Sequence, residues 1–171
     1  MIDSDMYTLN RKARFLFPPP IILALFLSFD LAVSWPRAIH LPEITEVSIK
    51  TWLAIAVLIF SIFIILISLL QLLFNKTTFN ALHADHTSKL VTNGCFKYSR
   101  NPVYLGFTCV QLSIATILDT NVGVLMTLLL VVFITQLHIK NEEAAMHKIF
   151  GDEWIRYKNK TKRWLNTPVF L

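Results

Sequence analysis

One polar segment, residues 90–106, joins a basic side chain to the predicted start of a helix. Asn101-Pro102 is typical of a helix N-terminus, because Asn caps the free N–H groups and Pro suits the first helical position. Such a helix end binds anions through its free N–H groups and partial positive charge, and Arg100 adds a full charge beside it. The segment therefore predicts a carboxylate site. On spacing alone it also fits a capped membrane helix with Arg100 and Tyr104 as interfacial anchors.

A second polar segment runs from His138 to Glu143 and follows the last long apolar run. His138 and Glu142 are four residues apart, so in a helix they share a face. The paired carboxylates of Glu142 and Glu143 could bind ribose hydroxyls or an amino group, and all three side chains are candidate proton acceptors. The alternative is a solvated helix end with an intrahelical His–Glu pair.

Two other groups of residues give weaker indications. His83, Asp85 and His86 are metal-ligand types without a fourth partner, so we predict no metal site. Asp30 lies inside an apolar run, where an ionisable residue suggests a function. We expect instead that it reaches the outer interface near Arg37.

Apolar helices must position these polar segments. The 171-residue chain is 54% hydrophobic and 16% charged, whereas a soluble domain carries about a quarter charged residues. We therefore expect an all-α integral membrane protein with about four transmembrane helices, short cytosolic C-terminal helices and a single domain over residues 1–171. The apolar runs of spanning length are residues 15–36, 52–74, 102–118 and 122–139.

The basic residues predict the orientation of these spans. The N-terminus, the 75–101 loop and the C-terminal tail together hold fourteen of the sixteen Lys and Arg residues. The positive-inside rule then places both termini and the 75–101 loop in the cytosol. We read the net charge of +5 as this topology signal and not as a sign of nucleic-acid binding.

The C-terminal tail predicts two short helices separated by Gly151, since glycine commonly follows a helix end. Trp154, Tyr157 and Trp164 alternate with basic residues in this tail. That pattern favours a helix lying at the lipid headgroup boundary.

Four motifs follow one another in a fixed order: Leu90-Val91-Thr92-x-Gly94-x-Phe96-x-Tyr98-Ser99-Arg100-Asn101-Pro102-x-Tyr104-x-Gly106, Glu142-Glu143, Phe150-Gly151-x-x-Trp154-x-x-Tyr157 and Lys162-Arg163-Trp164-Leu165. Their order and spacing resemble the isoprenylcysteine carboxyl methyltransferase family, which is similar in turn to the phospholipid methyltransferases. The resemblance covers about residues 77–165, the expected cofactor-binding core.

The resemblance implies methyl transfer from S-adenosylmethionine. The family's Arg-His-Pro-x-Tyr motif stands at Arg100, Asn101 and Tyr104, and Asn101 replaces a histidine with a group that does not titrate near neutrality. Arg163, with Arg156 close in register, is expected to engage the substrate. The expected cofactor-binding residues are Leu90, Val91, Gly94, Tyr98, Arg100, Asn101, Tyr104, His138, Glu142 and Glu143.

The methyl acceptor stays open at this point. Isoprenylcysteine is the family's naming substrate, but another lipid, a small thiol or an isoprenoid acid also fits. Sterol-type reductases share a similar C-terminal pattern, so an NADPH-dependent membrane reductase is an alternative, as is a non-catalytic membrane scaffold. We expect the bilayer and a lipophilic or small-molecule substrate as partners, with no nucleic acid and no obligate protein partner. The expected location is a bacterial inner membrane, with the active site facing the cytosol.

Overall fold

The computed structural model describes residues 16–38, 48–75 and 88–166, and these parts are all-helical, with no strand among them. The predicted all-α class is therefore confirmed for the described residues. The elements, in chain order, are α2 (Pro19–Ala38), α3 (Ile49–Phe74), the 3₁₀ turn η3 (Gly94–Lys97), α4 (Pro102–Ile117), α5 (Asn121–Ile134), the π-helical turn η4 (Thr135–Ile139) and α6 (Lys140–Lys160).

Each predicted apolar run corresponds to a helix, and three of these helices have an identifiable start. Ser48 caps α3 by accepting a hydrogen bond from the Thr51 N–H at 3.3 Å, and Thr120 caps α5 in the same way. Pro102 opens α4, as predicted. Two helices are long and apolar enough to cross a membrane by length and composition: Ile49–Phe74 and Asn121–Lys160, which comprises α5, η4 and α6. The apolar parts Pro19–Trp35 and Pro102–Ile117 are shorter.

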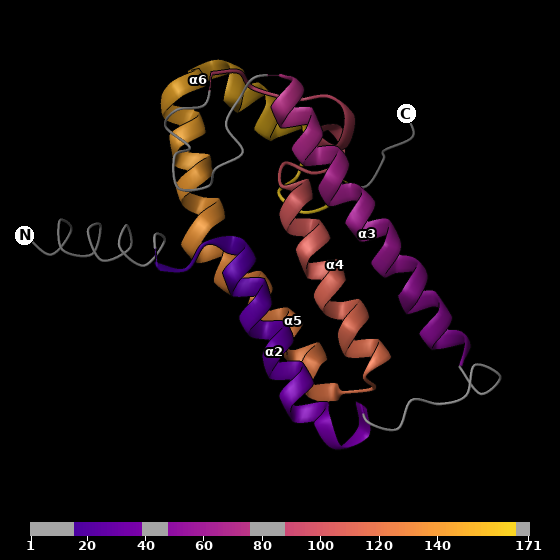
Figure 1. The fold of residues 1–171 in the computed structure, drawn as a ribbon. Helices are drawn as coiled ribbons and strands as arrows, with labels where there is room; N and C mark the ends of the chain where they lie inside the picture. Colours follow the sequence, from indigo (N-terminus) through magenta and orange to yellow (C-terminus); the bar gives the residue numbers. More distant parts are fainter. Residues whose placement is uncertain (1–15, 39–47, 76–87, 167–171) are drawn as a thin grey trace, which may run out of the picture.

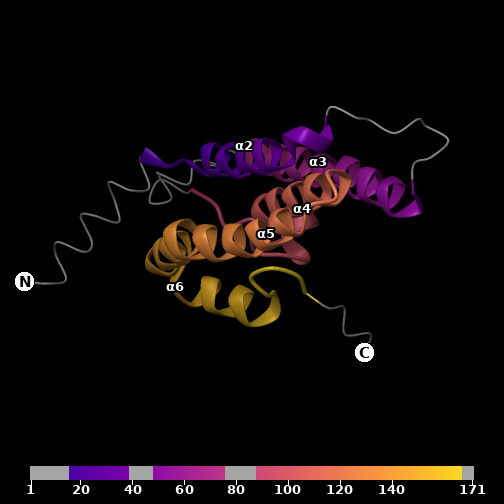
Figure 2. The same ribbon diagram turned by 90° about the horizontal axis from the view of Figure 1, so that it is seen from below.

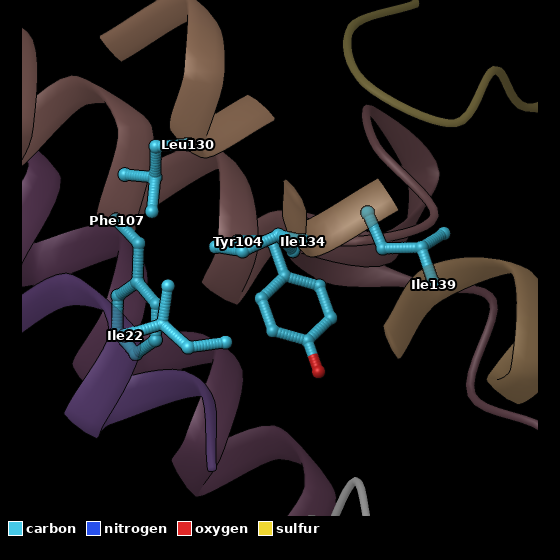
Figure 3. Packing of buried hydrophobic residues seen from close by; sticks show 6 residues of the cluster. All are labelled: Ile22, Tyr104, Phe107, Leu130, Ile134 and Ile139. Atoms are coloured by element: carbon cyan, nitrogen blue, oxygen red, sulfur yellow. The ribbon is translucent and has the colours of Figure 1, made fainter. Parts of the chain in front are cut away.

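The helices pack around α4. α3 runs along one side of α4, and α2 and α5 lie on the other (Figure 1). Gly106 lets α3 approach, because a Cβ there would lie 2.4 Å from the Ile65 Cγ1 atom. Figure 3 shows the main core, in which the Tyr104 ring packs among aliphatic side chains while its hydroxyl points away from them. The buried members of this core are Ile22, Tyr104, Phe107, Leu130, Ile134 and Ile139.

Asp30 is buried between α2, α4 and α5, so the prediction that it reaches the outer interface is wrong. Its side chain is fully buried, and its Oδ2 atom accepts a hydrogen bond from Gln111 Nε2 at 2.6 Å. A polar group in an apolar bundle is stabilised by such a partner, and Gln111 supplies it from α4. The side chain of Arg37 lies outside the described parts, as do His83, Asp85 and His86, for which we predicted no metal site.

Gly123 makes room for this buried pair. A Cβ at Gly123 would lie 2.6 Å from Ala115 Cβ and 2.9 Å from Asp30 Oδ2. We predict that Gly123→Ala lowers the free energy of unfolding by about 1–3 kcal/mol, because the bundle must shift to accept the methyl group. Denaturant unfolding in detergent measures this, with Val124→Ala at the neighbouring exposed position as control. Equal stability of the two variants would contradict it.

The C-terminal part turns back on itself. α5 continues through η4 into α6, and Gly151 breaks α6 with φ 49° and ψ −119°, which confirms the predicted break. Figure 2 shows the last part of α6 folded back toward the other helices. Trp154 and Tyr157 are buried there, in a second cluster with Val91 and Phe96. These two aromatic side chains therefore pack inside the protein and do not line an exposed face of the helix.

Candidate active site

The π-helical turn sets the direction of the site's carboxylates. Along α5 the buried residues Thr127, Leu130 and Ile134 recur every three or four positions, as in any α-helix. Ile134 and Ile139, on either side of the π turn, are both fully buried although they are five positions apart. A π turn holds an extra residue, so Glu143, a regular four positions after Ile139, returns to the buried face of α5.

Glu143 is held between two arginines, an arrangement we call the Glu143 clamp (Arg100, Glu143 and Arg163). Arg100 Nη2 donates to Glu143 Oε1 at 2.7 Å. Arg163 donates to both carboxylate oxygens, from Nε to Oε1 at 3.0 Å and from Nη2 to Oε2 at 2.5 Å. The Arg100 and Glu143 side chains are only 7% and 10% exposed. Charge-assisted hydrogen bonds are strong where water is largely excluded. With two arginines and one glutamate, the clamp carries a net charge of plus one.

Arg100 also fixes the chain that follows α6. Its Nη1 atom donates to the carbonyls of Lys158 and Thr161, each at 2.9 Å. Its guanidinium stacks 5.7 Å from the Trp154 ring centroid, close enough for a cation–π contact. Arg100, which the sequence suggested as an anion-site residue, thus joins the start of α4 to the end of α6.

Asn101 stands at the N-cap position of α4 but does not cap it with its side chain. Its Nδ2 atom donates instead to the Arg163 carbonyl at 3.0 Å. The capping prediction was therefore wrong, because the carbonyl of the folded-back tail holds the Asn101 amide group in a different orientation. Sequence spacing cannot reveal this long-range partner.

The clamp lowers the pKa of Glu143. Burial by itself raises the pKa of a carboxyl, but the hydrogen bonds from Arg163 and Arg100, together with their charges, outweigh burial and hold the pKa below its ordinary value of 4.5. The bond to Glu143 also raises the pKa of Arg163. Both groups are therefore ionised at neutral pH.

This lowered pKa predicts acid sensitivity. Because the folded pKa lies below the unfolded one, the clamp contributes its full stability above about pH 4.5 and loses it as the pH falls through the lowered pKa. We expect the unfolding midpoint of the wild type to drop across that acid range and that of Glu143→Gln to drop less. Thermal unfolding in detergent from pH 7 to pH 3 measures this. If the unfolding midpoints of the wild type and of Glu143→Gln fell equally with pH, the lowered pKa of Glu143 would be contradicted.

Glu142, the next residue, lies in a different environment. Tyr104 donates its hydroxyl to Glu142 Oε1 at 2.5 Å, a short contact. Tyr104 is buried and Glu142 is half-buried. His138 lies close by, with its ring centroid 6.5 Å from that of Tyr104 and its Nε2 atom 2.9 Å from the Phe17 carbonyl. The structure thus brings Tyr104, His138 and Glu142 together at the junction of α4, η4 and α6.

Gly94 is needed for a contact within the protein. Its φ of 56° is left-handed, and a Cβ there would overlap the Gln71 side chain. Gln71 Oε1 accepts a hydrogen bond from the Cys95 N–H at 3.0 Å and so ties η3 to the last turn of α3. Sequence reasoning missed Gln71. Its signal was a lone amide near the end of the charge-free run 52–74.

The remaining predicted residues lie around this core. Val91 is buried and Leu90 partly buried in the cluster with Trp154. Tyr98 is 56% exposed. Arg163 is part of the clamp, whereas Arg156 lies on the exposed face of α6.

The fold and the site together define a class: an all-α protein with long apolar helices and a charged, hydrogen-bonded site at one end of them. A family profile described as phospholipid methyltransferase matches residues 49–153. The chain belongs to this family, and the resemblance to the isoprenylcysteine carboxyl methyltransferase-like proteins is thereby confirmed. Membership implies methyltransferase activity in general.

One curated relative adds a narrower comparison. The chain is 33% identical over 63 residues to a protein of Haemophilus influenzae described as uncharacterized. The aligned segment covers 37% of this chain and the full length of the relative. No solved structure matches the chain significantly.

Proposed function

We propose that the protein transfers a methyl group from S-adenosylmethionine to a lipophilic or small acceptor at a membrane, with a carboxylate or thiol as the accepting group. Family membership is the observation that carries this proposal. No observation favours the NADPH-dependent reductase or the scaffold.

The groups at the start of α4 fit the polar parts of this cofactor. In the first turn of a helix the N–H groups, here of Val103 and Tyr104, have no intrahelical partner, and Asn101 does not cap them. They suit the methionine carboxylate. Arg100 Nε is a buried donor without a hydrogen-bond partner in the described chain. Glu142 is a carboxylate acceptor for the amino group or the ribose hydroxyls.

The chain's own tasks in the reaction are alignment and exclusion of water. When bound, the cofactor supplies a methyl group already activated by its sulfonium, so a carboxylate or thiolate acceptor needs no strong base. We assign Glu142 to hold the cofactor, with Tyr104 fixing the direction of its carboxylate. Glu143 orients Arg163, whose side chain pairs with the acceptor's anionic group, and Arg156 steers that group from the exposed face.

An amine acceptor would make a further demand. It must lose a proton before it attacks, and a nearby base must receive that proton. Glu143 is unsuited to this, because both of its oxygens already accept hydrogen bonds from arginine. Glu142 and His138 are then the candidate proton acceptors.

We further propose a multi-pass arrangement in a bacterial inner membrane, with four spans and both termini and the site on the cytosolic side. The charge asymmetry of the sequence supports this orientation. The site lies where α4 begins and η4 ends, at the opposite end of the helices from the Lys50–Asp119 ion pair. Lipophilic acceptors would reach it from the bilayer, and the polar cofactor from the cytosol.

A labelled-methyl assay tests the reaction. Purified protein is incubated with S-adenosylmethionine carrying a labelled methyl group and with bacterial lipid extract or a panel of thiols and isoprenoid acids. We expect incorporation by the wild type and a loss of at least about tenfold in Glu142→Gln. Absence of incorporation with every acceptor, from protein shown to be folded, would contradict the proposal.

A further inference from the structure

Two large apolar side chains are exposed beside the site, where buried aromatic residues account for most of the packing. Tyr98 is 56% exposed and Leu165 is 59% exposed. Lys97, Lys160 and Lys162 are exposed around them. We call these five residues the basic–aromatic patch. Apolar side chains left exposed in a group mark a surface for another partner.

Backbone hydrogen bonds bring the patch together from two distant segments. The Asn166 N–H donates to the Tyr98 carbonyl at 2.7 Å, which places Leu165 beside Tyr98. The Arg100 N–H donates to the Lys162 carbonyl at 3.0 Å. Asn166 Nδ2 donates to the Lys160 carbonyl at 3.2 Å. The tail therefore lies along residues 98–101, and the patch is a fixed feature of the fold.

The patch lies level with the ends of two apolar helices. Tyr98 directly follows η3, which the Cys95–Gln71 hydrogen bond ties to the last turn of α3. Phe74, at the end of that turn, is 82% exposed. α4 begins only four residues after Tyr98, at Pro102. If α3 and α4 cross a bilayer, the patch falls at the level of the headgroups.

We propose that the basic–aromatic patch binds the anionic headgroups of the bilayer and sets the depth of the active site. The inference rests on the membrane placement proposed above. Tyrosine prefers the interface, since its ring is apolar and its hydroxyl polar. Lysine side chains are attracted to anionic lipid. The three patch lysines are exposed, and none of the ion pairs among residues 48–75 and 88–166 involves them.

The folded-back part of α6 is a weaker candidate for this surface. It carries basic residues too, but Trp154 and Tyr157 are turned inward, and the Tyr157 hydroxyl donates to the Phe96 carbonyl at 2.7 Å. Its aromatic side chains cannot enter a lipid surface without unpacking this cluster. The patch combines exposed apolar side chains with lysines, which is the combination that headgroup binding needs.

Thermal unfolding of the full chain in nanodiscs tests the inference. The wild type is compared in phosphatidylcholine alone and with phosphatidylglycerol added. We expect a midpoint about 3 °C higher with the anionic lipid. The Lys97→Gln/Lys162→Gln variant should lose at least half of that rise, and high salt should remove it. The matched control, Lys148→Gln/Lys158→Gln, removes the same charge from exposed α6 positions and should keep the rise.

Two results of the nanodisc experiment would overturn lipid binding by the patch. A wild type indifferent to the anionic lipid would overturn it, as would a double variant that keeps the full rise. A second measurement covers a variant that fails to fold: a fluorophore at Leu165→Cys, in a Cys95→Ser/Cys109→Ser chain, should be quenched by lipids labelled at the headgroup. No quenching would overturn the inference. S-adenosylhomocysteine binding separates it from the proposed function, because the patch variants should bind as the wild type does.

Discussion

Glu143→Ala is expected to lower the free energy of unfolding by about 3–5 kcal/mol, the largest effect we predict for any single substitution. Removing the carboxylate leaves the buried Arg100 guanidinium, 7% exposed, facing a second cation in Arg163. The two uncompensated charges then repel each other, and the one on Arg100 is almost fully shielded from water. The tail beyond α6 loses the anchor that Arg163 provides. Chemical denaturation in detergent, followed by circular dichroism, measures the loss.

Two further variants serve as comparisons for Glu143→Ala. Glu143→Gln keeps the shape and one acceptor oxygen but removes the charge, so it should fall between the alanine variant and the wild type. Glu153→Ala removes a carboxylate from an exposed position of α6 and should change stability by less than about 0.5 kcal/mol. The clamp would lose its assigned importance if Glu143→Ala unfolded at the same denaturant concentration as Glu153→Ala.

Glu142→Gln is expected to weaken S-adenosylhomocysteine binding about 10- to 100-fold while the protein stays folded. Glu142 takes no part in the clamp, and its Oε1 accepts a hydrogen bond from Tyr104 at 2.5 Å. A lost hydrogen bond to a charged group costs about 1.5–3 kcal/mol, which corresponds to this range. Isothermal titration calorimetry on detergent-purified protein gives the affinities.

Tyr104→Phe should have a smaller effect of the same kind. It removes the hydroxyl that orients Glu142 and leaves the ring packed among Ile22, Phe107 and their neighbours. We expect about a tenfold loss of affinity, with an unfolding midpoint close to that of the wild type. If Glu142→Gln bound as tightly as the wild type, Glu142 would have no cofactor role, and the binding site would have to be sought elsewhere in the fold.

The sequence predicted the features that depend on local patterns. The all-α class, the helix start at Pro102 and the break at Gly151 follow from apolar periodicity and from the backbone preferences of Pro and Gly. These preferences act within a few residues, so the sequence alone expresses them. The ordered motifs also led to the family that the comparison then established.

Features that depend on long-range partners could not be predicted in this way. The fold places Asn101 against the Arg163 carbonyl and buries Asp30 beside Gln111, 81 positions along the chain. Trp154 and Tyr157 resembled an interfacial stripe because they alternate with basic residues. The fold instead turns them onto Phe96 and Val91.

The π-helical turn is an intermediate case. Spacing of four between His138 and Glu142 predicted a shared face in a regular α-helix. His138 and Glu142 do both lie next to Tyr104. The wider turn at Thr135–Ile139 changes the register earlier, so that Ile134 and Ile139, five apart, are both buried and Glu143 follows on the same face. A π turn has no simple sequence signature, and only the packing of the residues on either side of it reveals it.

The most direct test of the central claim is a calorimetric titration of the folded wild-type protein, in detergent, with S-adenosylhomocysteine and separately with NADPH. We predict saturable one-site binding of S-adenosylhomocysteine and no binding of NADPH. Binding of NADPH alone, or of neither ligand by a protein that unfolds cooperatively, would contradict the methyltransferase assignment.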